Sequence, residues 1–159
     1  MPKIHLDAAP AVMGTRYPPP FDLECAQRIK QRLGDAVGLT QFGVNLLRLA
    51  PGVWSSQRHW HTHEDEFIYV LEGEVVLITD AGEETLTAGD CAGFKAGVPD
   101  GHHIVNRSDR EAVLLEVGTR NPGGDGADYP DIDLTIKAGQ AAYLHKDGTP
   151  YDSSKGRLR

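Results

Sequence analysis

Hydrophobic and polar residues alternate along the middle of this chain, which is the pattern of β-strands that bury one face. The alternation begins at Phe42 and recurs in short runs as far as Val117. Glycine-containing turns are expected between the runs, at 51–52, 72–73 and 80–82. Many short strands at close, even spacing predict an all-β fold, an antiparallel barrel or sandwich.

The segment before the strands follows a different pattern. Residues 1–20 are rich in proline and small residues, so they predict an extended arm that lies over the barrel. Next, Asp22 can cap a helix and Gly34 can end one, which predicts a short helix between them. The apolar residues at helical spacing in this helix are Ala26, Ile29 and Leu33.

The chain is expected to form one domain, because 159 residues suffice for a single buried core. Within this domain, residues 1–41 are predicted to form the arm and short helix, and residues 42–118 the barrel. Residues 119–159 show no sustained hydrophobic period and predict an irregular C-terminal tail.

Charge and composition narrow the range of functions. The formal net charge of -7 argues against a surface that binds nucleic acid. The two cysteines, Cys25 and Cys91, form no disulfide framework, and no apolar run approaches the length of a membrane span. No charged-then-apolar signal is visible at the start, so we expect a cytoplasmic protein without nucleic-acid or membrane partners.

Histidines concentrate just before the predicted strand at 67–71. His59, His61 and His63 occupy alternate positions, so in an extended chain their imidazoles share one face. Neutral imidazole is a common ligand of zinc, iron, nickel, copper and manganese ions. Two imidazoles on one side of a strand can therefore reach one ion.

Glu66 is the preferred carboxylate partner of these histidines. In a regular strand it is out of phase with the first two of them. A bulge or turn between residues 62 and 65 would correct the phase, and bulges are frequent beside active sites. Glu64 and Asp65 are the competing carboxylates.

A second polar cluster lies further along the chain, at His102, His103 and Asn106. If Ile104 and Val105 lie in a strand, His102 and Asn106 share one face and His103 lies on the other. One histidine of the pair therefore points inward, and alternation alone does not choose between them.

Together the two clusters resemble the two sequence motifs of the cupin family. The first motif, G(X)5HXH(X)3-4E(X)6G, is matched with one extra residue after its first glycine by Gly52, His59, His61, Glu66 and Gly73. The second, G(X)5PXG(X)2H(X)3N, has lysine at 95 instead of proline and four residues rather than two before its histidine. Its matching residues are Gly89, Gly97, His102 and Asn106. The spacing to Asn106 favours His102 over His103.

The resemblance covers residues 42–118 and implies a double-stranded β-helix, the jelly-roll or cupin barrel, with a metal ion near its centre. The implied ligands are His59, His61, Glu66 and His102. This leaves His63 without a place among the ligands, and the solvated rim is preferred for it over a position that supports a ligand or a role as proton shuttle. Three imidazoles and one carboxylate leave one or two positions for water or substrate, as a catalytic site requires. We expect one divalent transition metal ion per chain, Zn, Fe, Mn or Ni. Apolar pocket walls are expected from Ile68, Val70 and Ile104.

Two classes of function follow from the resemblance. The first is a metal-dependent enzyme acting on a small molecule: a dioxygenase if iron is bound, or an isomerase, lyase or epimerase if zinc, nickel or manganese is. The second is a non-catalytic cupin that binds or senses a small molecule. We place the enzyme ahead of the binder because an open coordination site beside an apolar pocket suits catalysis.

Two tryptophans indicate a covered outer surface. By the same alternation Trp60 faces away from the histidines, and Trp54 is also expected on the barrel exterior. Such aromatic faces are covered by the arm or by a second subunit. We therefore expect a homodimer.

Overall fold

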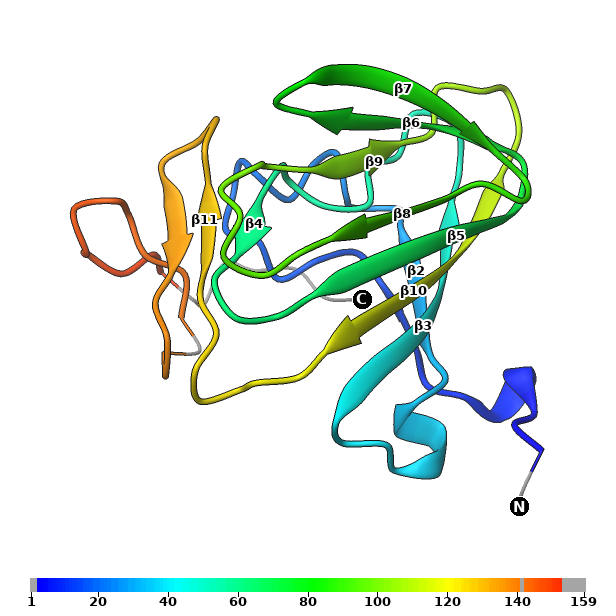
Figure 1. The fold of residues 1–159 in the computed structure, drawn as a ribbon, viewed down its shortest axis with the longest axis horizontal. Coiled ribbons are helices and arrows are strands. Elements are labelled where there is room, and N and C mark those ends of the chain that lie inside the picture. The colour runs from blue at the N-terminus through cyan, green and yellow to red at the C-terminus, as the bar shows by residue number, and fades with distance from the viewer. Residues whose placement is uncertain (1–2, 141, 153–159) are drawn as a thin grey trace.

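The computed structural model describes residues 3–140 and 142–152, and nearly all of its regular structure is β-strand (Figure 1). The largest sheet has six antiparallel strands in the order β1-β2-β3-β10-β5-β8. Their bounds are Ala11–Met13 (β1), Ile29–Arg32 (β2), Phe42–Leu49 (β3), Ala112–Thr119 (β10), Glu66–Glu72 (β5) and Cys91–Phe94 (β8). The predicted all-β fold is confirmed.

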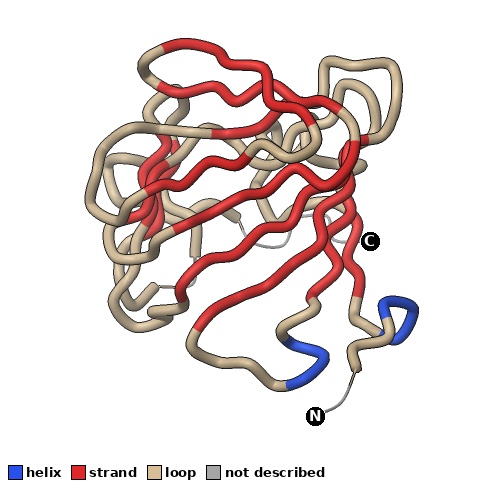
Figure 2. The backbone as a smooth tube through the Cα atoms, turned by 45° about the vertical axis from the view of Figure 1, so that its right-hand side comes forward, coloured by secondary structure: helices blue, strands red, loops and turns tan. Residues whose placement is uncertain are grey.

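Two three-stranded sheets complete the structure. The sheet β7-β6-β9, at the top of Figure 1, consists of Gly82–Thr87 (β7), Glu74–Thr79 (β6) and His103–Val105 (β9). The sheet β12-β11-β4 consists of Leu134–Ile136 (β12), Ala127–Tyr129 (β11) and Trp60–His61 (β4). Helix is limited, within the described residues, to the short turns Leu6–Ala8 and Asp35–Val37 (Figure 2). None of the helices described has the length and apolarity that a membrane span needs.

The main core lies between the six-stranded sheet and the β7-β6-β9 sheet. Along β5, Ile68 and Val70 are buried while Phe67 and Tyr69 are exposed, as a strand with one buried face requires. Apart from Val53, which follows β3, the core residues come from strands of both sheets: Leu47, Leu49, Ile68, Val70, Val75, Leu77, Leu86, Ile104, Ala112 and Leu114. The two sheets therefore pack face to face, as in a jelly roll.

The turn between β5 and β6 depends on Gly73. Its φ of 83° lies in the left-handed region that favours glycine. A Cβ atom at this position would lie 2.9 Å from the carbonyl oxygen of Glu111. The last glycine of the first motif is therefore needed for backbone conformation and for close approach of the chain.

The helix predicted after Asp22 is wrong. Residues 19–27 form turns and a bend, and Ile29–Arg32 is β2, which pairs with β1 and β3. Pairing on both sides outweighs a helical spacing of three apolar residues, because propensity is a weak prior when tertiary contacts compete. The tail predicted to be irregular also contributes β11 and β12. The division at 41 and 118 stays a prediction, although β1 and β2 of the arm extend the large sheet.

The arm covers one side of the barrel through a second hydrophobic cluster. Tyr17 and Cys25 of the arm are buried with residues of the tail, including Tyr129. Trp54 packs against this cluster, and its backbone N–H donates to the carbonyl oxygen of Glu24 at 3.0 Å. The arm thus covers Trp54. A second subunit was the other cover considered for that side chain.

The outer face of the large sheet carries exposed apolar side chains. Phe42, Phe67 and Tyr69 are each 38–40% exposed, and the strand neighbours of the latter two are Val117 and Leu115. We propose that the expected homodimer forms here, because an uncharged patch can face its own copy across a two-fold axis.

A double change, Phe67→Glu with Tyr69→Glu, is expected to convert the dimer into a monomer in sedimentation equilibrium, because it places like charges in the contact. Leu23→Glu, at a 69% exposed position of the arm, should leave the dimer intact. A wild-type protein that sediments as a monomer would contradict the proposal, as would a double variant that remains dimeric.

Candidate metal centre

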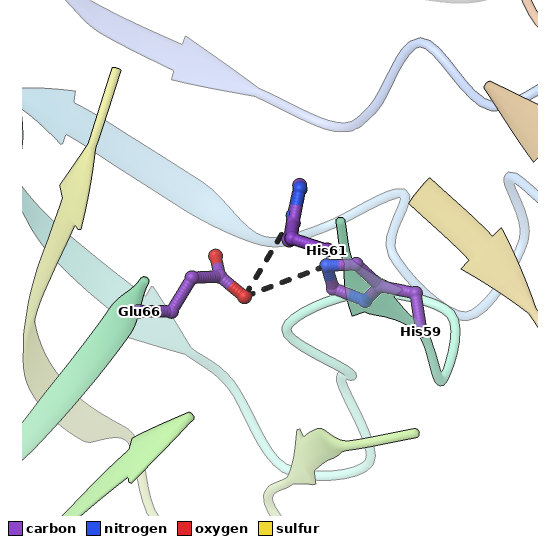
Figure 3. Close-up of side chains that lie close together, drawn as sticks. All are labelled: His59, His61 and Glu66. Atoms are coloured by element: carbon purple, nitrogen blue, oxygen red, sulfur yellow. Dashed lines mark ion pairs between the residues drawn. The ribbon is translucent and has the colours of Figure 1, made fainter. Parts of the chain in front are cut away.

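Three of the four predicted ligands converge where β4 meets β5 (Figure 3). Each offers one ligand atom, and these atoms all lie within 4.8 Å of one another. Glu66 Oε2 is 3.7 Å from His59 Nε2 and 3.8 Å from His61 Nε2. Donor atoms that share an ion at about 2.1 Å lie roughly 3.0–3.4 Å apart, so small side-chain rotations suffice for binding. The geometry fits a single ion.

A bend in the chain brings Glu66 into this cluster. After β4 the backbone bends at Thr62 and His63 before β5 begins at Glu66, which confirms the predicted irregularity between 62 and 65. The competing carboxylate of Asp65 accepts the backbone N–H of Ala96 at 2.8 Å. Asp65 belongs to neither group of candidate ligands.

The remaining competitor is Glu64, whose carboxylate accepts the backbone N–H of Asn121. Glu64 also belongs to a second, partly buried group with His61 and Asp125. His61 therefore lies between two acidic groups, and its Nε2 atom faces the Glu66 side.

His102 lies beside Glu66, and its Nε2 is 2.9 Å from Glu66 Oε2. Phe94 stacks on the His102 ring with a centroid distance of 3.6 Å and an interplanar angle of 1°. The Nδ1 of His103 is 3.1 Å from the carbonyl oxygen of Ser56, and its ring packs edge-on against Trp54 at a centroid distance of 4.6 Å. The structure thus directs His102 toward the cluster, as the motif spacing indicates, and the ligand role itself stays a prediction.

Hydrogen bonds fix the orientation of two of these rings. His59 Nδ1 is 2.8 Å from the carbonyl oxygen of Gln57, and His61 Nδ1 is 2.6 Å from Asp125 Oδ2. Because both partners are acceptors, each Nδ1 carries the proton and each Nε2 keeps its lone pair directed at the cluster. Such outer hydrogen bonds are characteristic of imidazoles that bind metals.

Asp125 is a site residue that the sequence analysis missed. It lies in a glycine-rich loop of the predicted irregular tail, and its Oδ1 accepts the backbone N–H of His63 at 2.8 Å. The loop reaches the site because β11 pairs with β4, with Ala127 opposite His61. The only local signal is an acidic residue flanked by glycines, which does not distinguish a site residue from an ordinary turn.

The protonation states suit metal binding. Burial lowers the pKa of His59 to about 4, against the opposing effect of Glu66, so this imidazole is neutral at pH 7. Burial raises the pKa of Glu66, but the hydrogen bond from His102 and the neighbouring imidazoles outweigh burial and hold that pKa well below its usual range. The cluster thus offers an anionic carboxylate and a neutral imidazole.

The cluster forms part of the wall of a cavity of about 190 Å³. Ile68 and Ile104 line it as predicted, whereas Val70 is fully buried in the core and is absent from the lining. Polar groups that the expected apolar wall did not include are also present: Arg28, Lys30, Ser55, Ser56 and Glu116. The cavity therefore suits a polar or charged ligand.

The Asp125→Asn change is expected to weaken metal binding about 10- to 100-fold, because an amide nitrogen in place of Oδ2 cannot accept the His61 proton. The ring would then carry its proton on Nε2, where the ion would bind. Competition with a fluorescent chelator measures the metal dissociation constant. The matched control is Asp133→Asn, since Asp133 Oδ2 pairs with His145 Nδ1 at 2.6 Å in another part of the molecule. An unchanged dissociation constant in Asp125→Asn would rule out this orienting role.

The fold and the site together define a small jelly-roll barrel with a histidine and carboxylate cluster in its cavity. The chain belongs to the cupin superfamily: the Cupin domain model matches residues 45–118, and a 46% identical cupin spans the whole barrel. That crystal structure, from Silicibacter pomeroyi, is described as a sugar phosphate isomerase from a cupin superfamily. The alignment covers 98% of this chain and 100% of that chain, with a TM-score of 0.88.

Two further crystal structures are similar over most of the fold. One from Acidithiobacillus ferrooxidans, named as a candidate sugar phosphate isomerase, is 30% identical over 83% of this chain and 80% of its own, with a TM-score of 0.70. One from Thermotoga maritima, named a predicted oxalate decarboxylase, is 19% identical over 75% of this chain and 99% of its own, with a TM-score of 0.60. At this identity the likeness supports the fold alone. No curated protein matches the chain at the same level of significance.

Proposed function

We propose that this protein is a metal-dependent cupin isomerase that acts on a sugar phosphate. The observation that carries the proposal is the convergence of His59, His61 and Glu66 on the wall of a cavity that also contains cationic side chains. Two solved structures, 46% and 30% identical to this chain, bear the name of this activity. That likeness favours an isomerase over the oxygen chemistry of an iron dioxygenase.

In this proposal His59, His61, Glu66 and His102 hold one divalent transition metal ion. The donor set fits such an ion, since two rings are oriented by outer hydrogen bonds and the carboxylate is anionic. A bound divalent ion supplies a Lewis acid that polarises a carbonyl or hydroxyl oxygen of the substrate.

Glu116 is the proposed proton carrier. Of the residues that line the cavity, it is the one carboxylate outside the metal cluster. Its Oε2 lies 2.7 Å from Lys30 Nζ and 3.2 Å from Asn45 Nδ2, and these contacts hold the carboxylate in position.

With Glu116 as proton carrier, every atom of an aldose–ketose isomerisation is accounted for. Glu116 removes a proton from the carbon beside the carbonyl group, this proton exchanges with solvent on the carboxyl group, and Glu116 then delivers a proton to the former carbonyl carbon. The hydroxyl proton meanwhile moves to the former carbonyl oxygen, so the molecular formula is unchanged. Ile68, Ile104 and Phe94 supply the apolar part of the cavity wall.

The test is proton NMR in D₂O of metal-loaded protein with aldose phosphates of five and six carbons. We expect ketose phosphate to appear with deuterium at the exchanging carbon. Glu116→Gln should lower turnover about 10²- to 10⁴-fold at unchanged metal content, because it removes the proton carrier. Glu111→Gln, whose carboxylate pairs with Arg48 at an exposed site, is the control and should keep full turnover. If the aldose phosphates bind saturably but none gives ketose phosphate or deuterium exchange, the result would instead support a non-catalytic cupin that binds a small molecule.

A further inference from the structure

A row of cations lies where the arm meets the barrel. Arg28, Lys30 and Arg32 occupy alternate positions along and just before β2, so their side chains share one face of the strand. Arg16, from the segment that follows β1, joins them. All four line a recess of about 150 Å³ at this edge of the molecule. We call this recess the basic recess.

Acidic partners neutralise two of the four cations. Lys30 Nζ lies 2.7 Å from Glu116 Oε2, and Arg32 Nη1 lies 3.8 Å from Asp35 Oδ2. Across residues 3–140 and 142–152 no carboxylate is paired with Arg16 or with Arg28. The recess therefore keeps excess positive charge in a chain whose net charge is -7.

Arg28 is held in a fixed position without being neutralised. Its Nε donates to the carbonyl oxygen of Gly14 at 3.0 Å, and its Nη1 donates to the carbonyl oxygen of Ser55. The guanidinium is half-buried, and its other N–H groups remain available to an anion. A planar guanidinium oriented in advance binds a phosphate group with two parallel hydrogen bonds.

The basic recess adjoins the cavity of the metal cluster. Tyr17, Arg28 and Lys30 line both of them. Arg28 and Lys30 therefore border the cavity that His59 and Glu66 line as well as the recess. A small ligand with its anionic group in the recess can extend toward the metal cluster.

We propose that Arg28, Lys30 and Arg16 form the subsite for the phosphate group of the substrate. This inference rests on the proposed function and deepens it, because it assigns recognition of the phosphate group to the arm and β2, outside the strands that bear the metal cluster. It defines the substrate class as small phosphomonoesters whose unphosphorylated end reaches Glu66. In this proposal Lys30 links phosphate binding to proton transfer, since it would contact the phosphate group and it already contacts the Glu116 carboxylate.

The first measurement is a titration of metal-free protein with inorganic phosphate, in which NMR chemical shifts of the backbone amides report binding. We expect saturable shifts confined to the residues of the basic recess. Arg16→Gln and Arg28→Gln should each raise the dissociation constant about tenfold, because each removes a charge-assisted interaction. Arg107→Gln is the control: Arg107 pairs with Glu83 at an exposed site outside the recess, and the constant should change less than twofold.

Arg16→Gln keeps the test decisive if Arg28→Gln fails to fold, because Arg16 is exposed and carries no structural hydrogen bond within the described residues. With an aldose phosphate as substrate, Arg16→Gln should raise KM and leave kcat and metal content unchanged. An equal loss of phosphate binding in Arg107→Gln, or no saturable phosphate binding by the wild type, would overturn the subsite.

The outcomes separate the subsite from the proposed function. Phosphate binding in the basic recess by a protein that isomerises no sugar phosphate would uphold the subsite and overturn the isomerase. Isomerase activity with an unchanged KM in Arg16→Gln and Arg28→Gln would uphold the isomerase and overturn the subsite.

Discussion

Replacing both His59 and His61 by alanine is expected to abolish the metal content of the protein and to lower its melting temperature. These two rings supply two of the three donor atoms that lie within 4.8 Å of one another. An ion that binds only the folded state stabilises that state by mass action, by about 2.7 kcal/mol when its free concentration is a hundred times the dissociation constant. For a domain of this size that corresponds to a loss of roughly 5–10 °C.

Elemental analysis of protein purified without a histidine tag and without added metal measures the effect, with thermal unfolding recorded in parallel. His145→Ala is the control, because His145 pairs with Asp133 and belongs to neither group of candidate ligands. Stoichiometric metal in the double variant would show that the site assignment is wrong. The identity of the bound ion bears on the reaction: zinc, manganese or nickel supports the isomerase, whereas iron reopens oxygen chemistry.

The second large effect concerns Asn106, which is fully buried and forms hydrogen bonds with both ends of its side chain. Its Nδ2 donates to the carbonyl oxygens of Leu49 and Arg110, each at 2.7 Å. Its Oδ1 accepts the backbone N–H of Ser108 at 2.9 Å and the hydroxyl of the same residue at 2.7 Å. The asparagine of the second motif therefore links β3 to the loop before β10.

Asn106→Leu should lower the free energy of unfolding by about 3–5 kcal/mol, because it removes a fully buried amide that bonds the carbonyl oxygens of Leu49 and Arg110 and the backbone N–H of Ser108. Urea unfolding monitored by circular dichroism gives this value directly. Ser108→Ala removes only the hydroxyl donor and should cost about 1 kcal/mol. An Asn106→Leu variant as stable as the wild type would show that these hydrogen bonds contribute nothing net.

Local patterns in the sequence suffice for the barrel and for most of the cluster. The alternation from Phe42 to Val117 predicts the strands, since inward and outward positions along β5 alternate as the sequence does. The phase mismatch of Glu66 predicts a backbone irregularity, which is the bend at Thr62 and His63. These features depend on residues that are close together in the chain. The sequence alone therefore suffices to predict them.

Features that depend on distant pairing were not predictable in the same way. Whether Ile29 lies in a helix or a strand is decided by β1 and β3 on either side of it. Asp125 reaches His61 only because the tail pairs with β4. The same holds for the cations of β2, which a helix would have distributed around its surface and which the strand aligns on one face.

The pairing of β11 with β4 has a consequence for protein engineering. Residues 45–118 include every proposed ligand of the ion, yet Asp125 and Arg28 lie outside them. Tyr129, which stacks on the His59 ring at a centroid distance of 5.4 Å, is outside them as well. A transplant of this minimal module into another scaffold would carry the ligands without the groups that orient them. The unit that engineers can exchange between proteins is therefore the barrel together with both of its extensions.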